Sequence, residues 1–159
     1  MDHQGALYIF QGGPDNVAWF EFVRNHGAER LNYYLRHGFY WVCPKGVKIG
    51  DRAFIYLTAP LSRIVGLVEV TGEPFWNYPD RFDNSFMAGK RCVRISFLEA
   101  FDTESDLLTI WNLRKIFAQD WGWVRYPRGS TRIPQEDGIR NAFLQLVNEV
   151  RNECKYNNS

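Results

Sequence analysis

Residues 48–76 read KIGDRAFIYLTAPLSRIVGLVEVTGEPFW, and this stretch predicts the centre of the fold. Two apolar runs rich in β-branched and aromatic residues, 53–57 and 64–70, predict two strands. The link between them, TAPLSR, suits a hairpin loop better than a crossover, so we expect the two strands to pair in antiparallel fashion. Gly66 interrupts the second strand, where a glycine indicates a bulge or a close approach of another backbone.

The flanking sequence predicts further strands and helices around this hairpin. Alternating or continuous apolar runs predict the strands, and Asp15 or Asn16 is placed to cap the first helix. A capping-box pattern at 103–106 and a 3.6-residue apolar period near the C-terminus predict the later helices. The predicted elements are strands at 7–11, 39–42 and 92–97, and helices at 15–26, 31–35, 107–117 and 139–154.

This order of elements predicts an α+β protein with a small curved sheet and flanking helices. A chain of 159 residues suits one domain, which we place at residues 1–154, with a polar C-terminal tail at 155–159. No run approaches the ~18 apolar residues of a membrane span. The N-terminus lacks the pattern of an export signal, so we expect no membrane association and a cytoplasmic protein.

The usual catalytic and metal-binding motifs are missing from the sequence. It contains no GxSxG, HExxH, Walker loop or GxGxxG, and its histidines are scattered. Cys43, Cys92 and Cys154 are odd in number and far apart, which is typical of buried thiols rather than a disulfide framework or a zinc site. We therefore expect no metal, no cofactor and no enzymatic activity.

Basic residues gather locally although the net charge is only +1. One cluster precedes the strand at 92–97, another lies within 121–134, and residues 99–106 are acidic, so the charge is segregated along the chain. Segregation is consistent with one basic face, although solvated surface charge gives the same pattern. The predicted phosphate-binding residues are Lys90, Arg91, Arg125, Arg128 and Arg132.

Aromatic residues are abundant, with six Trp, eight Tyr and twelve Phe. Many fit core positions, but Trp41, Trp76, Trp121 and Trp123 lie at the ends of predicted segments, where binding sites tend to gather. A nucleobase can stack on such a ring while arginines hold the neighbouring phosphates. The alternative for each indole is a partly buried core position with its N–H hydrogen-bonded.

Four segments together resemble the EVE domain family, a part of the PUA-like superfamily that is related to YTH domains. They are YIFQGGP at 8–14, KIGDRAFIY at 48–56, RIVGLVEVTGEPF at 63–75 and RYPRGSTRIPQED at 125–137. The resemblance spans nearly the whole chain. It implies a PUA-like curved mixed sheet or small barrel, with a pocket that receives a flipped, modified base.

The resemblance also implies which residues line that pocket. Trp41 occupies the place of one cage tryptophan, and the other aromatics would come from Trp76, Tyr78, Phe82 and Phe86, of which Phe86 is nearest in spacing. Residues after the first strand would read the polar edge of the base. The predicted base-binding residues are Gly12, Gly13, Asp15, Asn16, Trp41, Trp76, Phe82 and Phe86.

The expected partner is DNA or RNA that carries a modified, for example methylated, base. The protein would act as a monomeric recognition part alongside a nuclease or other effector domain or subunit. Two alternatives stay open. One is a small PUA-like enzyme acting on a modified nucleoside or amide through Lys48, Thr58 and Glu69, and the other is a protein-interaction domain whose aromatic residues face a partner.

Overall fold

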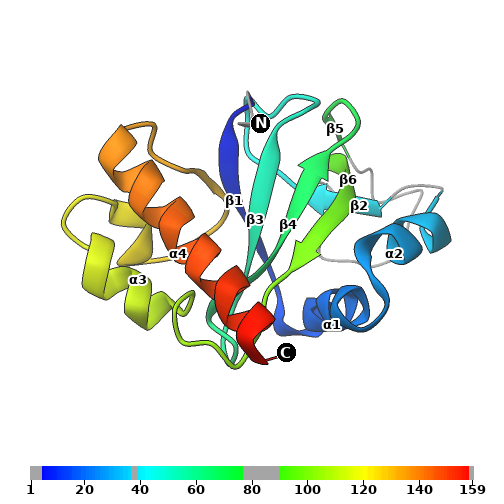
Figure 1. Cartoon of the computed structure of the whole chain (residues 1–159). Helices are drawn as coiled ribbons and strands as arrows, with labels where there is room; N and C mark the ends of the chain where they lie inside the picture. The colour runs from blue at the N-terminus through cyan, green and yellow to red at the C-terminus, as the bar shows by residue number, and fades with distance from the viewer. Residues whose placement is uncertain (1–4, 37–38, 77–89, 158–159) are drawn as a thin grey trace.

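A mixed, curled β-sheet forms the centre of the molecule (Figure 1). The computed structural model describes residues 5–36, 39–76 and 90–157. Its strand order is β2-β6-β4-β3-β1-β7, with β5 also paired to β6. β1 and β3 run parallel, and the other pairings are antiparallel. The strands are β1 (Leu7–Gly12), β2 (Phe39–Val42), β3 (Arg52–Leu57), β4 (Arg63–Val70), β5 (Phe75–Trp76), β6 (Arg91–Ala100) and β7 (Thr131–Arg132).

Helices lie on both sides of this sheet (Figure 1). A 3-10 turn, η1 (Pro14–Asn16), leads into α1, and a second, η2, follows α3. Gly27 ends α1 with φ of +95°, a conformation that glycine adopts without steric cost. The α-helices are α1 (Val17–His26), α2 (Ala28–Tyr34), α3 (Ile110–Phe117) and α4 (Asp137–Asn157), and η2 covers Gly122–Val124.

The predicted hairpin is present as β3 and β4, the two strands at the middle of the sheet. Gly66 is where another segment approaches closely, as its position in the strand predicted. A Cβ atom at Gly66 would lie 2.3 Å from the Phe20 ring and 2.7 Å from the Glu99 carbonyl oxygen. Register shifts at 55/56 and 67/68 flank this position and add to the curl of the sheet.

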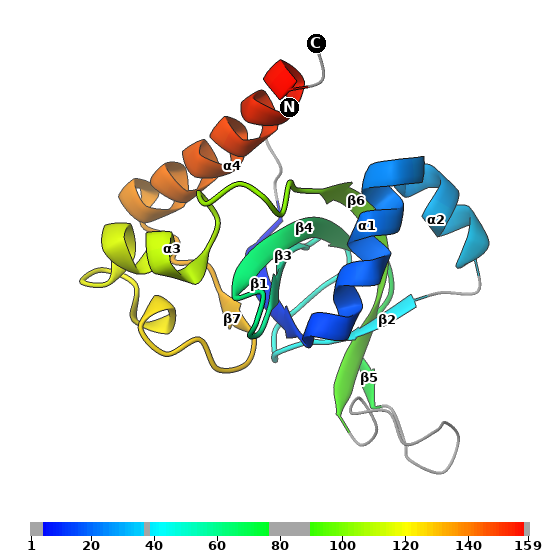
Figure 2. The ribbon, with the colours of Figure 1, turned by 90° about the horizontal axis from the view of Figure 1, so that it is seen from below.

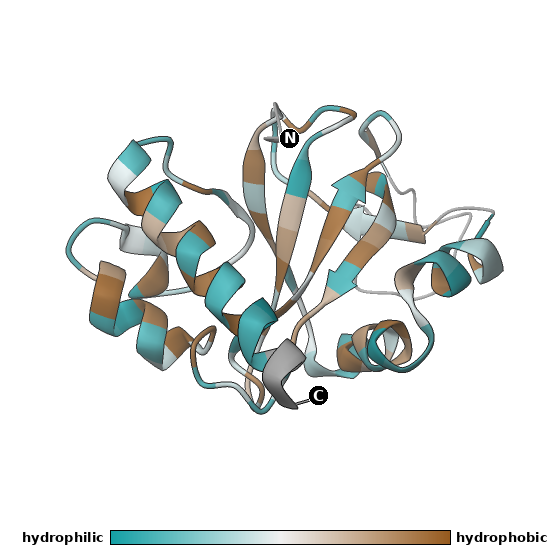
Figure 3. Cartoon of the chain, in the orientation of Figure 1, coloured by the Kyte–Doolittle hydropathy of each residue, from teal (hydrophilic) through white to brown (hydrophobic). Residues whose placement is uncertain are grey.

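The two faces of the sheet support two hydrophobic clusters. One cluster packs α1 and α2 on the inside of the curl through Phe20, Val23 and Leu31. The other packs α3 and α4 on the opposite face through Leu113, Phe143 and Val147. Figure 2 shows α1 beside the curl with α3 and α4 on its other side, and Figure 3 shows largely hydrophobic strands behind an α4 whose visible face is mostly hydrophilic.

The helix predicted after the capping-box pattern begins later than expected. α3 starts at Ile110, and its N-cap is Thr109, whose hydroxyl accepts a hydrogen bond from the Asn112 amide at 3.3 Å. The Arg63 guanidinium donates to the carbonyl oxygens of Thr103 and Ser105, which holds that segment as a loop. The capping-box assignment was therefore wrong, because a tertiary contact uses those backbone acceptors.

The C-terminal helix runs further than predicted. α4 continues to Asn157, so residues 155–157 are helical rather than part of a separate tail. None of the described helices is long and apolar enough to cross a membrane. The α+β prediction with flanking helices is confirmed by this arrangement.

Candidate functional site

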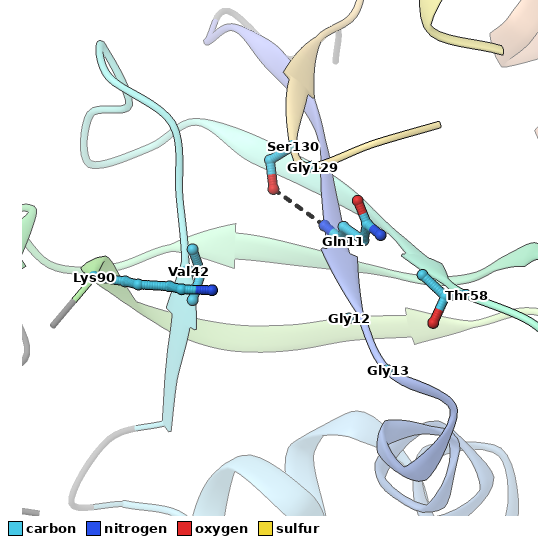
Figure 4. A pocket seen from close by; sticks show the side chains of 8 residues that line it. All are labelled: Gln11, Gly12, Gly13, Val42, Thr58, Lys90, Gly129 and Ser130. Atoms are coloured by element: carbon cyan, nitrogen blue, oxygen red, sulfur yellow. Dashed lines mark hydrogen bonds between the residues drawn. The ribbon is translucent and has the colours of Figure 1, made fainter. Parts of the chain in front are cut away.

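A cavity of about 370 Å³ opens where the parallel strands β1 and β3 end, a volume within the usual range for small-ligand sites. Residues from five separate parts of the chain line it (Figure 4). The Lys90 side chain extends past Val42 toward β1, and the Gln11 amide lies on the side of β1 nearer Thr58. The lining residues are Gln11, Gly12, Gly13, Val42, Thr58, Lys90, Gly129 and Ser130.

Gly12 is required by the packing behind the cavity wall. A Cβ atom at Gly12 would lie 2.6 Å from Cζ2 of Trp41 and 2.8 Å from Oδ1 of Asn16. The Trp41 indole N–H donates to the Gln11 carbonyl at 3.0 Å, and the side chain is 0% exposed. Trp41 thus supports the end of β1 from the core and is not among the residues that line the cavity.

Gln11 presents an amide group at this wall. Its backbone N–H donates to Ser130 Oγ at 3.1 Å, and its carbonyl accepts from Trp41. The side-chain Oε1 is buried and has no hydrogen-bond partner among the described residues. A buried acceptor without a partner is costly, so a ligand donor at this position would bind favourably.

The opposite wall comes from the loop before β7. Gly129 has φ of +67°, and its carbonyl accepts a hydrogen bond from the Trp123 indole at 3.1 Å. Trp123 packs edge-on against Tyr56 and is stacked on Trp121. Both indoles therefore anchor this loop to the second hydrophobic cluster, and Trp121, at 3% exposed, belongs to the core.

Of the predicted phosphate-binding residues, Lys90 is among those that line the cavity, and the four arginines are not. Lys90 lines the cavity, and Arg128 and Arg125 are exposed in the segment that leads to Gly129. Arg132 is exposed on β7, which pairs with β1. Arg91 sits over the Trp76 ring, with its guanidinium carbon 5.6 Å from the ring centroid. Trp76 is 54% exposed on β5, so that ring is available at the surface.

Apart from Trp41 and Trp76, the predicted base-binding residues divide into three groups. Gly12 and Gly13 line the cavity. Asn16 folds back so that its Oδ1 accepts from the Gly13 amide at 3.2 Å, and Asp15 is exposed. Phe82 and Phe86, together with Tyr78, lie outside the described residues.

Sequence reasoning missed Gln11, Val42, Gly129 and Ser130 as cavity residues, and it named Thr58 only for the enzyme alternative. Gln11 lies within one of the four family-like segments, and Gly129 and Ser130 lie within another, so position in those segments was the available signal. Their meeting at one cavity depends on the β1–β3 and β1–β7 pairings. Residue type alone does not reveal such long-range pairings.

The residues of the enzyme alternative do not meet at one site. Thr58 lines the cavity, but Glu69 is paired with Arg52 at the other end of β3, and Lys48 is exposed. Thr58 lies six positions after Arg52, just past the end of β3, which is about 20 Å along an extended strand. The described part of the chain also holds no group of three or more His, Cys, Asp or Glu side chains suited to a metal ion.

The thiols next to the cavity are buried and reduced. Cys43 follows the lining residue Val42, and Cys92 lies two residues after Lys90. Burial, followed by the nearby Cys92, raises the pKa of Cys43 from 9.0 to about 11. Burial likewise raises the pKa of Cys92. Both thiols are therefore protonated at neutral pH, as predicted for structural cysteines.

The curled mixed sheet with helices on both sides and a cavity at the strand ends is the α+β architecture of PUA-like proteins. The chain belongs to the EVE domain family, whose model matches residues 6–140. No curated protein matches the sequence.

Solved structures of low sequence identity share this fold. A hypothetical protein from Leishmania major has a TM-score of 0.65 at 12% identity, with 92% of this chain and 96% of that chain covered. A protein from Pseudomonas syringae has a TM-score of 0.61 at 15% identity, with coverage of 89% and 99%. A mutant of the ASCH protein of Zymomonas mobilis has a TM-score of 0.52 at 9% identity, with coverage of 87% and 98%.

Proposed function

We propose that this protein binds nucleic acid and holds one extruded, modified base in the cavity at the ends of β1 and β3. The observation that carries the proposal is the buried, unpartnered Oε1 of Gln11 in a cavity that Lys90 also lines. A base presents hydrogen-bond donors and acceptors at its polar edge, and a side-chain amide can accept from the donors and donate to the acceptors. Membership of the EVE domain family supports the same assignment.

The walls suit an extruded base because they are fixed before binding. Extrusion costs a few kcal/mol, and a preformed pocket recovers more of that cost than one that must order itself. Here the Trp41 and Trp123 indoles hold the two walls through hydrogen bonds to the carbonyls of Gln11 and Gly129. Direct stacking of a base on Trp41 stays a prediction. Because the ring is fully buried and does not line the cavity, such stacking would require the ring to become exposed.

The arginines near the rim would hold the nucleic-acid backbone. Arg125 and Arg128 are exposed beside Gly129, and Tyr126 between them is 77% exposed. Exposed rings among cations suit stacking of neighbouring bases with phosphate contacts on either side. Trp76, with Arg91 over its ring, provides a second such pair.

The decisive experiment compares wild type with Gln11→Met on oligonucleotides that carry methylated or hydroxymethylated cytosine, methylated adenine, or no modification. Both described hydrogen bonds of Gln11 use its backbone, so the substitution leaves them in place and removes only the amide. We expect the preference for a modified base to fall about tenfold, the loss of one good hydrogen bond. Fluorescence anisotropy measures both affinities.

Arg128→Ala is the matched control for this measurement. Because a phosphate contact carries no sequence information, this variant should weaken binding to modified and unmodified strands equally and reduce the salt slope by about 1. If Gln11→Met kept the wild-type preference for the modified base, the Gln11 amide would be excluded as the group that recognises this base. If the protein instead bound a protein partner with an affinity that neither nucleic acid nor salt changed, the result would favour a protein-interaction domain.

A further inference from the structure

A second cavity, of about 360 Å³, lies between α4 and the starting ends of β1 and β3. Leu7 and Arg52, which pair at the beginning of the two strands, both line it. The first cavity lies where the same strands end, about 17 Å away along β1. The two cavities are therefore separate, and one base cannot occupy both.

The second cavity combines arginines with apolar side chains. Arg52 comes from β3, whereas Arg140 and Arg151 come from α4, about 16 Å apart along the helix. The apolar part includes Leu7, Phe54 and Leu144. Leu7 and Phe54 also belong to the hydrophobic cluster under α4, so the floor of the cavity is continuous with the core.

Two of these arginines are neutralised by acidic residues. Arg151 donates from Nε and Nη2 to the Glu99 carboxylate at 2.6 to 3.0 Å, and its Nη1 donates to Asn148 at 2.8 Å. Arg52 Nε lies 3.5 Å from Glu69 Oε1, but it is buried and makes no directed hydrogen bond within the described residues. Glu99 and Glu69 thus balance two of the three charges.

Arg140 supplies the uncompensated charge. Its backbone N–H donates to the Glu136 carbonyl, and its guanidinium has no ion-pair or hydrogen-bond partner in the described part of the chain. Glu136 and Asp137 precede it in sequence and are exposed, without an ion pair to it there. Among the residues that the structure describes, the cavity therefore offers one unpaired guanidinium, a buried unsatisfied Arg52 Nε and an apolar floor.

We propose that this cavity binds a small organic anion that has a carboxylate head and an apolar body. The head would contact Arg140 and the Nε of Arg52, because a guanidinium offers directional donors that match a carboxylate. The body would lie on Leu7, Phe54 and Leu144. This assignment is independent of the nucleic-acid function proposed for the first cavity.

The test uses octanoate as the probe and the full chain as the protein. Titration calorimetry should show one saturable site for octanoate, weaker binding of acetate, and none of the cation octyltrimethylammonium. Arg140→Gln should weaken octanoate binding tenfold or more, since hydrogen bonds to charged groups are the stronger kind. Arg30→Gln, a matched change at an exposed arginine of α2, should leave the affinity unchanged.

Amide chemical-shift changes locate the probe during the same titration. Shifts at Leu7, Arg52 and Leu144 support the proposal, and shifts at Gln11 and Gly129 instead would overturn it. Equal affinity in Arg140→Gln and Arg30→Gln, or no octanoate binding by the wild type, would also overturn it. If an unmodified oligonucleotide displaced octanoate, the proposed carboxylate ligand would be wrong, and the cavity would instead bind a nucleic-acid phosphate. Arg140→Gln removes no described side-chain contact, so it should melt at the wild-type temperature.

Discussion

Burial fixes the position of the Trp41 indole and keeps the Cys43 thiol protonated beside the first cavity. The Trp41 indole on β2 and the Cys43 thiol, two residues further on, both face the core. The family resemblance implies a base-binding cage residue at Trp41, and the sequence predicts a buried thiol at Cys43. The thiol prediction is confirmed. The alternative for Trp41, a buried position with its indole N–H hydrogen-bonded, is the arrangement in the structure, and it depends on Gly12, which is distant in sequence.

The raised pKa of Cys43 predicts how stability depends on alkaline pH. The folded state holds the thiol proton more tightly than the unfolded chain, whose thiol has a pKa near 9.0 against about 11 in the fold. This contribution to stability is complete below about pH 9 and is lost as the pH rises through about 11. Burial also raises the pKa of Tyr8 and Tyr56, which adds to the loss.

We therefore expect the melting temperature of the wild type to fall between about pH 9 and pH 11, and that of Cys43→Ala to fall less steeply. Thermal denaturation followed by circular dichroism at several pH values measures both slopes. The comparison uses slopes rather than absolute temperatures, because the smaller side chain shifts the starting stability of the variant. Parallel slopes for the two proteins would contradict the assignment to Cys43.

At the scale of elements, the β3–β4 hairpin sets the geometry that the rest of the sheet follows. β4 passes so close to α1 and β6 that only a glycine fits at position 66. The Phe20 ring and the Glu99 carbonyl occupy the space that any side chain there would need. Interiors are packed densely enough that neither neighbour can move without disturbing others.

Gly66→Ala should lower the free energy of unfolding by about 1 to 3 kcal/mol, the usual cost of overpacking. Gly13→Ala is the control: no atom lies within 4 Å of its Cβ position, and its backbone is extended with φ of −88°. The control should change stability by less than about 0.5 kcal/mol. Urea denaturation reports both values, and similar midpoints for the two variants would contradict the close approach.

At the scale of the whole molecule, local sequence patterns predict most of the helices and strands but few of the pairings and contacts between them. The hairpin, the first strand and the closing helix follow from apolar periodicity, and the structure contains all three. The parallel β1–β3 pairing, the short strand β7 and the delayed start of α3 depend on contacts across many residues. For the same reason the sequence indicated Gly12, Gly13 and Lys90 for the site but missed Gln11 and Ser130.

The first cavity is assembled from parts of the chain as distant as Gln11, Thr58 and Ser130. No single segment of the chain supplies the whole cavity wall. Ligand binding in the cavity and folding of the whole domain are therefore thermodynamically linked. A molecule that fills this space binds the native state and has no equivalent site on the unfolded chain. Its binding free energy is therefore added to the stability of the entire domain.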